Sequence, residues 1–194
     1  MSLIPMVIKR NHEGERSMDL FSRLLDDRII MLADDFQDGM ASIIVAQLLY
    51  LESMDNTKPI TMYINSPGGS VVSMWSIVDT INLIKAPVHT ICIGLAASAG
   101  SVVLAAGEKG FRYILPNARV MIHQPMAGMQ GQVTDMEITV KESIRTKNDI
   151  IDFFVEVTGQ KITKIRTDME RDYWMSAKQA LEYGIVDKIL SKGK

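Results

Sequence analysis

A serine that follows an apolar strand is the residue of this chain best suited to chemistry. Ser98 lies in the small-residue segment 94–100 (GLAASAG), directly after the β-branched stretch 88–93. A β-branched run that stops at glycine and continues as small residues predicts a strand that turns sharply into a helix. Unpaired N–H groups and the helix dipole favour negative charge at a helix N-terminus, so a serine placed there can serve as a nucleophile.

A serine hydroxyl needs a base to take its proton, and imidazole is the usual one near neutral pH. His123 ends the apolar stretch 119–122 and is followed by Gln-Pro, which forces a loop. Because sites gather at strand ends in α/β sheets, we favour His123 as the base. His89, near a strand start, is expected to be a core or interface histidine, and His12 lies in a polar surface loop. A role for His123 as a simple cap of its strand stays open.

A histidine base in turn needs a carboxylate that holds its tautomer and supports the imidazolium. The polar run 167–172 offers three candidates, Asp168, Glu170 and Asp172. Composition and spacing do not separate these three, and a solvated charged face is the default interpretation of such a run. Only the fold can bring a serine, a histidine and an aspartate from such distant positions together.

A glycine pair could supply the backbone hydrogen-bond donors that acyl chemistry needs. The segment 66–70 (SPGGS) joins an expected strand at 60–65 to an expected helix at 71–85. Paired glycines let backbone N–H groups point outward, which suits an oxyanion hole. The same loop would also suit a phosphate or a carboxylate, and a tight strand-to-helix turn is the simplest interpretation.

The elements that must position these residues alternate along the chain. We expect strands at 28–32, 60–65, 88–93, 111–115 and 119–122, and helices at 40–53, 71–85 and 99–106. Near the C-terminus, Ser176 and Gln179 form a capping-box pattern before a short helix that ends at Gly184 and a strand-like stretch at 185–190. Strands that alternate with helices predict an α/β fold with a mostly parallel sheet.

A long helix is expected between these parts. Thr134 and Glu137 form a capping-box pattern, helical spacing runs to Thr158, and Gly159 is placed as a stop. Such a helix would be about 36 Å long. A domain of this size has a radius of about 17 Å. We therefore expect the rod to project and a partner subunit to cover its apolar stripe; the alternative is that it lies flat across its own core.

Composition excludes several classes of protein. A length of 194 residues suits one domain, and a net charge of −2 does not favour nucleic-acid binding. The single cysteine, Cys92, excludes an intrachain disulfide, fits a reducing compartment and is expected to be a buried small hydrophobe. The uncharged stretch 86–107 is better explained by a buried strand and helix than by a membrane span, and the start of the chain does not have the pattern of a signal peptide. No P-loop or zinc motif occurs, so we expect neither metal nor cofactor.

Several motifs in one order resemble a known family. They are YINSPGGS at 63–70, GLAASAG at 94–100, PNARVMIHQP at 116–125, QGQ at 130–132, TGQ at 158–160 and ERD at 170–172. Together they closely resemble the proteolytic subunit of the Clp protease, the ClpP family, and the resemblance runs from Leu3 to Asp187.

The resemblance implies a single peptidase domain over residues 1–194 with a ClpP/crotonase-type fold of repeated β-β-α units and a projecting handle helix at 134–158. It implies Ser98 as nucleophile, His123 as base and Asp172 as the carboxylate that orients it. By position, the oxyanion donors would be the backbone N–H groups of Gly69 and Ala99. The implied activity is that of a cytoplasmic serine endopeptidase that cleaves unfolded polypeptides and short peptides.

The resemblance also implies an assembly. Two stacked seven-membered rings would enclose the active sites, and residues 1–16 would form an axial segment. A Clp-family AAA+ ATPase would unfold substrates and dock at a surface pocket that includes Tyr63 and Leu83.

Three positions depart from the pattern of the family. Ala99 stands where methionine is usual, Ala127 where glycine is usual, and Leu83 where an aromatic residue is usual. These departures motivate the hypothesis of a divergent paralogue that is weakly active alone and works with a second ClpP. A non-catalytic ring subunit and a crotonase-like acyl-CoA enzyme are the two competing interpretations.

Overall fold

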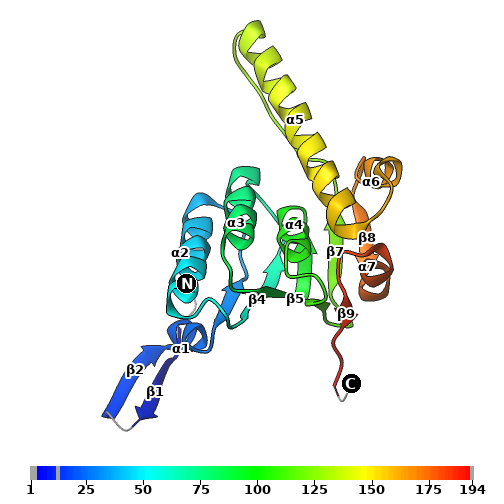
Figure 1. The fold of residues 1–194 in the computed structure, drawn as a ribbon. Coiled ribbons are helices and arrows are strands. Elements are labelled where there is room, and N and C mark those ends of the chain that lie inside the picture. Colours follow the sequence, from blue (N-terminus) through cyan, green and yellow to red (C-terminus); the bar gives the residue numbers. More distant parts are fainter. Residues whose placement is uncertain (1–3, 12–13, 193–194) are drawn as a thin grey trace.

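The structure is a computed structural model that describes residues 4–11 and 14–192. Its centre is a seven-stranded sheet (Figure 1). Five parallel strands follow in the order β3 (Ile29–Leu32), β4 (Ile60–Ser66), β5 (Val88–Ala97), β6 (Arg112–Ile114) and β9 (Lys188–Ile189). The strand β7 (Arg119–Ile122) pairs with the end of β5, and β8 (Tyr173–Ser176) runs antiparallel to β7.

Three helices lie side by side along the sheet: α2 (Asp38–Met54), α3 (Val71–Leu83) and α4 (Ala99–Ala105) (Figure 1). They cover apolar positions that alternate along the strands, such as the fully buried Ile60, Met62 and Ile64 of β4. Every residue of α4 is buried, as expected for a helix that consists of small and aliphatic residues. The predicted α/β fold with a mostly parallel sheet is confirmed.

The strand before Ser98 is longer than the sequence pattern predicts. We expected it to stop at Gly94, but β5 continues to Ala97. Two contacts carry it past the glycine: the Asn65 side chain accepts a hydrogen bond from the N–H of Leu95 at 3.0 Å, and β7 pairs with residues 95–97. The glycine gives room for this bridge, since a Cβ there would lie 2.5 Å from the Asn65 Oδ1.

The long helix α5 (Val133–Thr158) projects from the rest of the molecule (Figure 1). Its base is anchored by the buried Ile150, Ile151 and Phe154, whereas the outer half is exposed. The expected capping box at Thr134 was wrong: the helix begins at Val133 with Gln132 as N-cap and without a side-chain cap. Thr134 thus lies inside the first turn, where its own backbone is helical.

The N-terminal part forms a hairpin that was not predicted. It consists of β1 (Met6–Asn11) and β2 (Gly14–Asp19), followed by α1 (Leu20–Asp26). The N–H of Leu20 donates to the carbonyl of Pro5 and ties the hairpin to α1. The expected axial segment 1–16 overlaps this hairpin, but its residues 1–3 and 12–13, including His12, lie outside the described residues.

The C-terminal part packs at the base of α5. It contains α6 (Ile162–Asp168), β8 and α7 (Ala177–Tyr183). The capping box at Ser176 and Gln179 is confirmed, with both of its hydrogen bonds present, and Gly184 ends the helix at φ +91°. The strand expected at 185–190 is limited to β9. The Asp187 carboxylate binds the Arg112 side chain.

The uncharged stretch 86–107 is divided between β5 and α4. Over the part of the chain that the structure describes, none of the helices has the length and apolar character needed to cross a bilayer.

Candidate active site

Ser98 stands on a sharp turn between β5 and α4. Its backbone has φ +53° and ψ −121°, a conformation that is strained for a residue other than glycine. The turn is held by the Ser98 N–H, which donates to the Met121 carbonyl at 2.9 Å, and by the Ser101 hydroxyl, which donates to the Ser98 carbonyl at 2.6 Å. A strained strand-to-helix elbow of this kind presents a serine hydroxyl above the end of a sheet.

His123 reaches this hydroxyl because its strand runs beside β5. The parallel pair β5–β7 places Ala97 opposite Met121, so the segments that follow the two strands leave the sheet at the same edge. The Nε2 atom of His123 lies 2.9 Å from the Oγ atom of Ser98. The imidazole is only 13% exposed, so little water competes for this contact.

The antiparallel pairing of β7 with β8 selects Asp172 from its acidic neighbours. Ile122 lies opposite Tyr173, and the next residues along the two strands, His123 and Asp172, therefore face each other. The Nδ1 atom of the imidazole lies 2.9 Å from the Asp172 Oδ1. Asp168 instead accepts a hydrogen bond from Tyr183, and Glu170 lies near Lys147, so neither contacts the histidine.

The contacts assign the proton of the neutral imidazole. A carboxylate only accepts, so Nδ1 must donate to Asp172. Nε2 is then the acceptor for the Ser98 hydroxyl. In this tautomer the ring is poised to take the proton of the serine, while the negative charge of Asp172 would stabilise the imidazolium. Asp172 is 59% exposed, although the usual partner in such an arrangement is buried.

The glycine pair lies directly against the elbow. Gly68 has φ +102°, and a Cβ there would lie 2.6 Å from the Cβ of Ser98 and 3.1 Å from the N of Ala99. The Gly68 N–H is already used, because it donates to the Ser66 hydroxyl at 3.1 Å. Within residues 4–11 and 14–192, the loop and cap hydrogen bonds leave the N–H groups of Gly69 and Ala99 without an acceptor. No acceptor of the described residues therefore uses these two donors, as an oxyanion hole requires.

A narrow apolar pocket of about 20 Å³ adjoins Ser98 and His123. Its apolar wall comes from α3, α4, the loop after His123 and the base of α5, and it consists of Val71, Met74, Ala99, Val102, Pro125, Ile150 and Phe154. The volume is about that needed for one water molecule. Ala99, which stands where the family usually has methionine, thus lies on the wall of this pocket.

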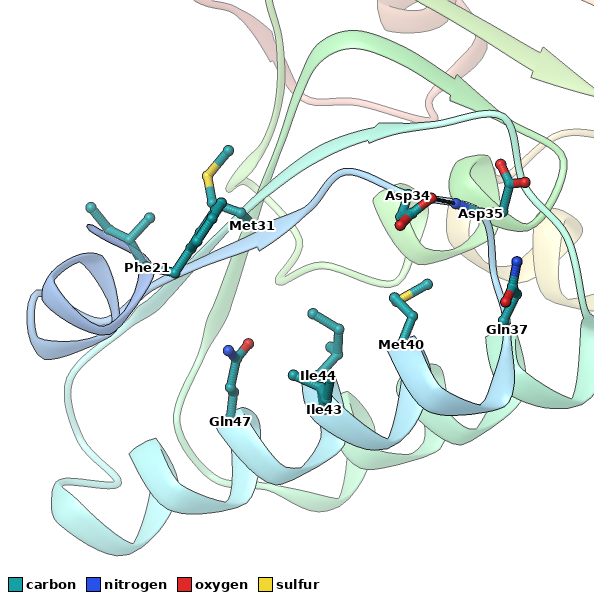
Figure 2. A pocket seen from close by; sticks show the side chains of 10 residues that line it. Phe21, Met31, Asp34, Asp35, Gln37, Met40, Ile43, Ile44 and Gln47 are labelled. Atoms are coloured by element: carbon teal, nitrogen blue, oxygen red, sulfur yellow. Dashed lines mark hydrogen bonds between the residues drawn. The ribbon is translucent and has the colours of Figure 1, made fainter. Parts of the chain in front are cut away.

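A much larger pocket, about 450 Å³, lies away from Ser98 between α1, β3 and α2 (Figure 2). It is lined by Phe21, Ile29, Met31, Asp34, Asp35, Gln37, Met40, Ile43, Ile44 and Gln47. Figure 2 shows apolar side chains from both sides of the groove and two carboxylates at one end. It contains no serine, cysteine or histidine, so we place the chemistry at the smaller pocket, where hydrogen-bond geometry supports it.

The other residues singled out by sequence lie elsewhere. Tyr63 is half-buried on β4, and Leu83, the last residue of α3, is 78% exposed. His89 stacks on Phe111 with ring centroids 4.3 Å apart, and desolvation lowers its pKa. Cys92 is confirmed as a buried small hydrophobe, and burial raises the pKa of its thiol to about 11.

One residue that the sequence pattern did not single out also contributes. Ser66 orients the glycine loop, since its hydroxyl accepts from the Gly68 N–H and donates to the Asp34 carbonyl at 2.6 Å. The position of Ser66 beside the glycine pair was the signal in the sequence that could have indicated this role.

Among the described residues, no group of three or more His, Cys, Asp or Glu side chains is arranged to hold a metal ion.

The α/β fold and the Ser–His–Asp arrangement define a protein of the serine hydrolase class. Residues 12–193 match the family model described as Clp protease. The chain is also 52% identical over 190 residues to the ATP-dependent Clp protease proteolytic subunit 2 of Bacillus licheniformis, a match that covers 98% of this chain and 100% of that protein. The chain belongs to the Clp protease family, as the motifs predicted, and is a homologue of its serine endopeptidase subunits.

Proposed function

We propose that this chain cleaves peptide bonds with Ser98 as nucleophile, His123 as general base and Asp172 as the residue that orients the imidazole. The observation that carries the proposal is the unbroken pair of contacts, 2.9 Å from Ser98 Oγ to His123 Nε2 and 2.9 Å from His123 Nδ1 to Asp172 Oδ1.

The geometry supports a two-stage hydrolysis. Ser98 Oγ attacks the scissile carbonyl carbon while its proton passes to His123 Nε2, and Asp172 remains ionised. The N–H groups of Gly69 and Ala99 bind the oxyanion of the tetrahedral intermediate. The imidazolium then protonates the leaving amine, the C–N bond breaks, and an acyl group remains on Ser98. Water, deprotonated by His123, attacks the acyl carbon and releases the acid product and the serine.

The exposed half of α5 supports an assembly. Apolar side chains on it are exposed by 40 to 68%; they are Val133, Ile138, Val140 and Ile144. A monomer gains nothing from exposing such a stripe, whereas another copy of the same helix would cover it. We propose that residues 1–194 form one subunit of two stacked seven-membered rings, with handle helices packed between the rings and residues 1–16 at the axis.

The family suggests a partner. The B. licheniformis relative is a subunit of an ATP-dependent protease, whereas this chain carries no P-loop motif of its own. We propose that a Clp-family AAA+ ATPase unfolds protein substrates and docks near Tyr63 and the exposed Leu83. The single buried cysteine is compatible with a cytoplasmic location.

Covalent labelling tests the peptidase proposal. A fluorophosphonate should label the wild-type protein and leave the Ser98→Ala variant unlabelled, because the probe reacts only with an activated serine. The same samples are measured for peptide turnover and for native mass by light scattering. An unlabelled wild-type assembly would refute the proposed mechanism, and a monomer would refute the ring.

The departures from the family pattern leave a second candidate to be tested. Ala99 lines the pocket beside Ser98, so this pocket lacks the side chain that is usual in the family. We propose as the alternative a subunit that needs a second paralogue for full activity. Rapid peptide turnover by the pure chain would refute it.

A further inference from the structure

The amino group of Lys147, on α5, joins the two segments that carry the histidine and the aspartate of the site. Its Nζ atom donates to the Gln124 Oε1 at 2.8 Å and lies 3.2 Å from the Glu170 Oε2. Gln124 directly follows His123, and Glu170 lies two residues before Asp172. One side chain of the handle helix thus contacts the residue after His123 and a residue two positions before Asp172.

Two more hydrogen bonds close this network. The Gln124 side-chain Nε2 donates to the Glu170 carbonyl at 2.9 Å, and the Gln124 N–H donates to the carbonyl of the fully buried Met169 at 2.7 Å. The regular β7–β8 ladder ends at the pair Ile122–Tyr173. Beyond that pair, these bonds hold the two chains together where His123 and Asp172 must meet.

Asp172 needs such external support. It is 59% exposed, so burial does not hold its side chain in place. Its hydrogen bond to His123 depends on where the backbone of 169–172 lies. Lys147 is only 27% exposed, and the helix that carries it is anchored by the buried Ile150, Ile151 and Phe154. The base of α5 therefore offers a rigid support that the exposed aspartate lacks.

We propose that Lys147 is a positioning residue for catalysis: through Gln124 and Glu170 it holds His123 and Asp172 in hydrogen-bonding register. The proposal rests on the proposed peptidase function. It assigns Lys147 no contact with substrate. Of the two contacts of Lys147, the hydrogen bond to Gln124 contributes more to this positioning than the ion pair with Glu170, because the Glu170 carboxylate is 60% exposed.

The test replaces Lys147 in two ways. Lys147→Met keeps the aliphatic stem and removes the donors, and should lower kcat for a short peptide about 10- to 100-fold with KM little changed. Lys147→Arg keeps the charge and donors, and should recover most of the loss. The control is Lys178→Met on α7, an 82% exposed lysine that pairs with Glu182 on the surface of the same helix; it should match the wild type.

Further measurements separate positioning from folding. The melting temperature and native mass of Lys147→Met should match the wild type, and its rate of fluorophosphonate labelling should fall with kcat. If Lys147→Met changes mass or stability, Glu170→Gln decides, since it removes the charge of one partner on the exposed side; it should lower kcat by a few fold. The double variant should be no slower than Lys147→Met, because the two residues act as one unit.

The outcomes distinguish this inference from the proposed function. A wild-type protein that is not labelled at Ser98 refutes the function itself. A labelled wild type together with a Lys147→Met variant of unchanged kcat refutes only the positioning role. Failure of Lys147→Arg to recover activity, or fully additive losses in the double variant, would also overturn it.

Discussion

The close approach between the glycine loop and the nucleophile makes Gly68→Ala the most informative substitution. A methyl group at this position would lie 2.6 Å from the Ser98 Cβ and 2.8 Å from the Ala97 carbonyl oxygen. Neither neighbour can rotate away, because one is backbone and the other is fixed to the strained elbow. The φ of +102° adds a second cost, since residues with a Cβ rarely adopt it.

The size of the effect follows from these distances. Carbon atoms pack at about 3.5 to 4.0 Å, so the loop and the elbow must separate by about 1 Å. A displacement of 1 Å in a catalytic group costs about 100-fold in rate. The unfavourable backbone conformation costs about 1 to 3 kcal/mol of folding free energy. We expect kcat for a short peptide to fall about 100-fold while the protein remains folded.

The assay combines three measurements on one preparation: peptide turnover, the rate of fluorophosphonate labelling at Ser98, and the free energy of unfolding in denaturant. The control is Gly39→Ala on α2, where a Cβ meets nothing within 4 Å, and it should turn over peptide at the wild-type rate. A Gly68→Ala variant with wild-type kcat and labelling rate would refute the argument that this contact sets the position of the nucleophile.

Two further predictions follow from the same structure. Asp187→Asn should lower the free energy of unfolding by about 3 kcal/mol in a denaturant titration, because it leaves the 4% exposed Arg112 side chain without its bidentate carboxylate partner. Burial opposes the charge of Asp187, but the hydrogen bonds from Arg112 outweigh burial, and the pKa of Asp187 is lowered. The stabilisation by the ion pair is therefore present above about pH 4 and is lost as pH falls through the depressed pKa. Equal losses of unfolding free energy for Asp187→Asn at pH 7 and pH 2 would contradict this prediction. Ile144→Asp, on the exposed stripe of α5, should reduce the native mass measured by light scattering, and an unchanged mass would place the subunit contact elsewhere.

Local patterns predicted much of the fold. The β-branched stretches became β3 to β5, the helices between them formed at α2, α3 and α4, and the capping box at Ser176 has both hydrogen bonds. Each of these depends on residues close in sequence. The long helix also followed from spacing, and Gly159 ends it with φ +70°. Its start was misplaced, because a Thr-x-x-Glu pattern does not exclude a helix that begins one residue earlier.

Elements that local residue patterns do not mark clearly were missed. The hairpin β1–β2 is held by pairing between its own strands and by the bond from Leu20 to Pro5, and its alternation of apolar residues is weak. The strand β8 directly follows the polar run 167–172, and it exists because β7 pairs with it. The extension of β5 to Ala97 required the Asn65 side chain and β7, both far along the chain.

The sequence by itself determined which residue types were available: one serine after a buried strand, few histidines, and a glycine pair after a neighbouring strand. Composition and spacing left three acidic residues equal and did not show which N–H groups were free; only the family resemblance implied Asp172, Gly69 and Ala99. The tertiary structure decided both points. The antiparallel register of β7 and β8 places Asp172 opposite His123, and the Ser66 hydroxyl occupies the Gly68 N–H while that of Gly69 stays open. The reason is physical: strand register and hydrogen-bond partners depend on contacts between segments far apart in the chain, which local residue preferences do not specify.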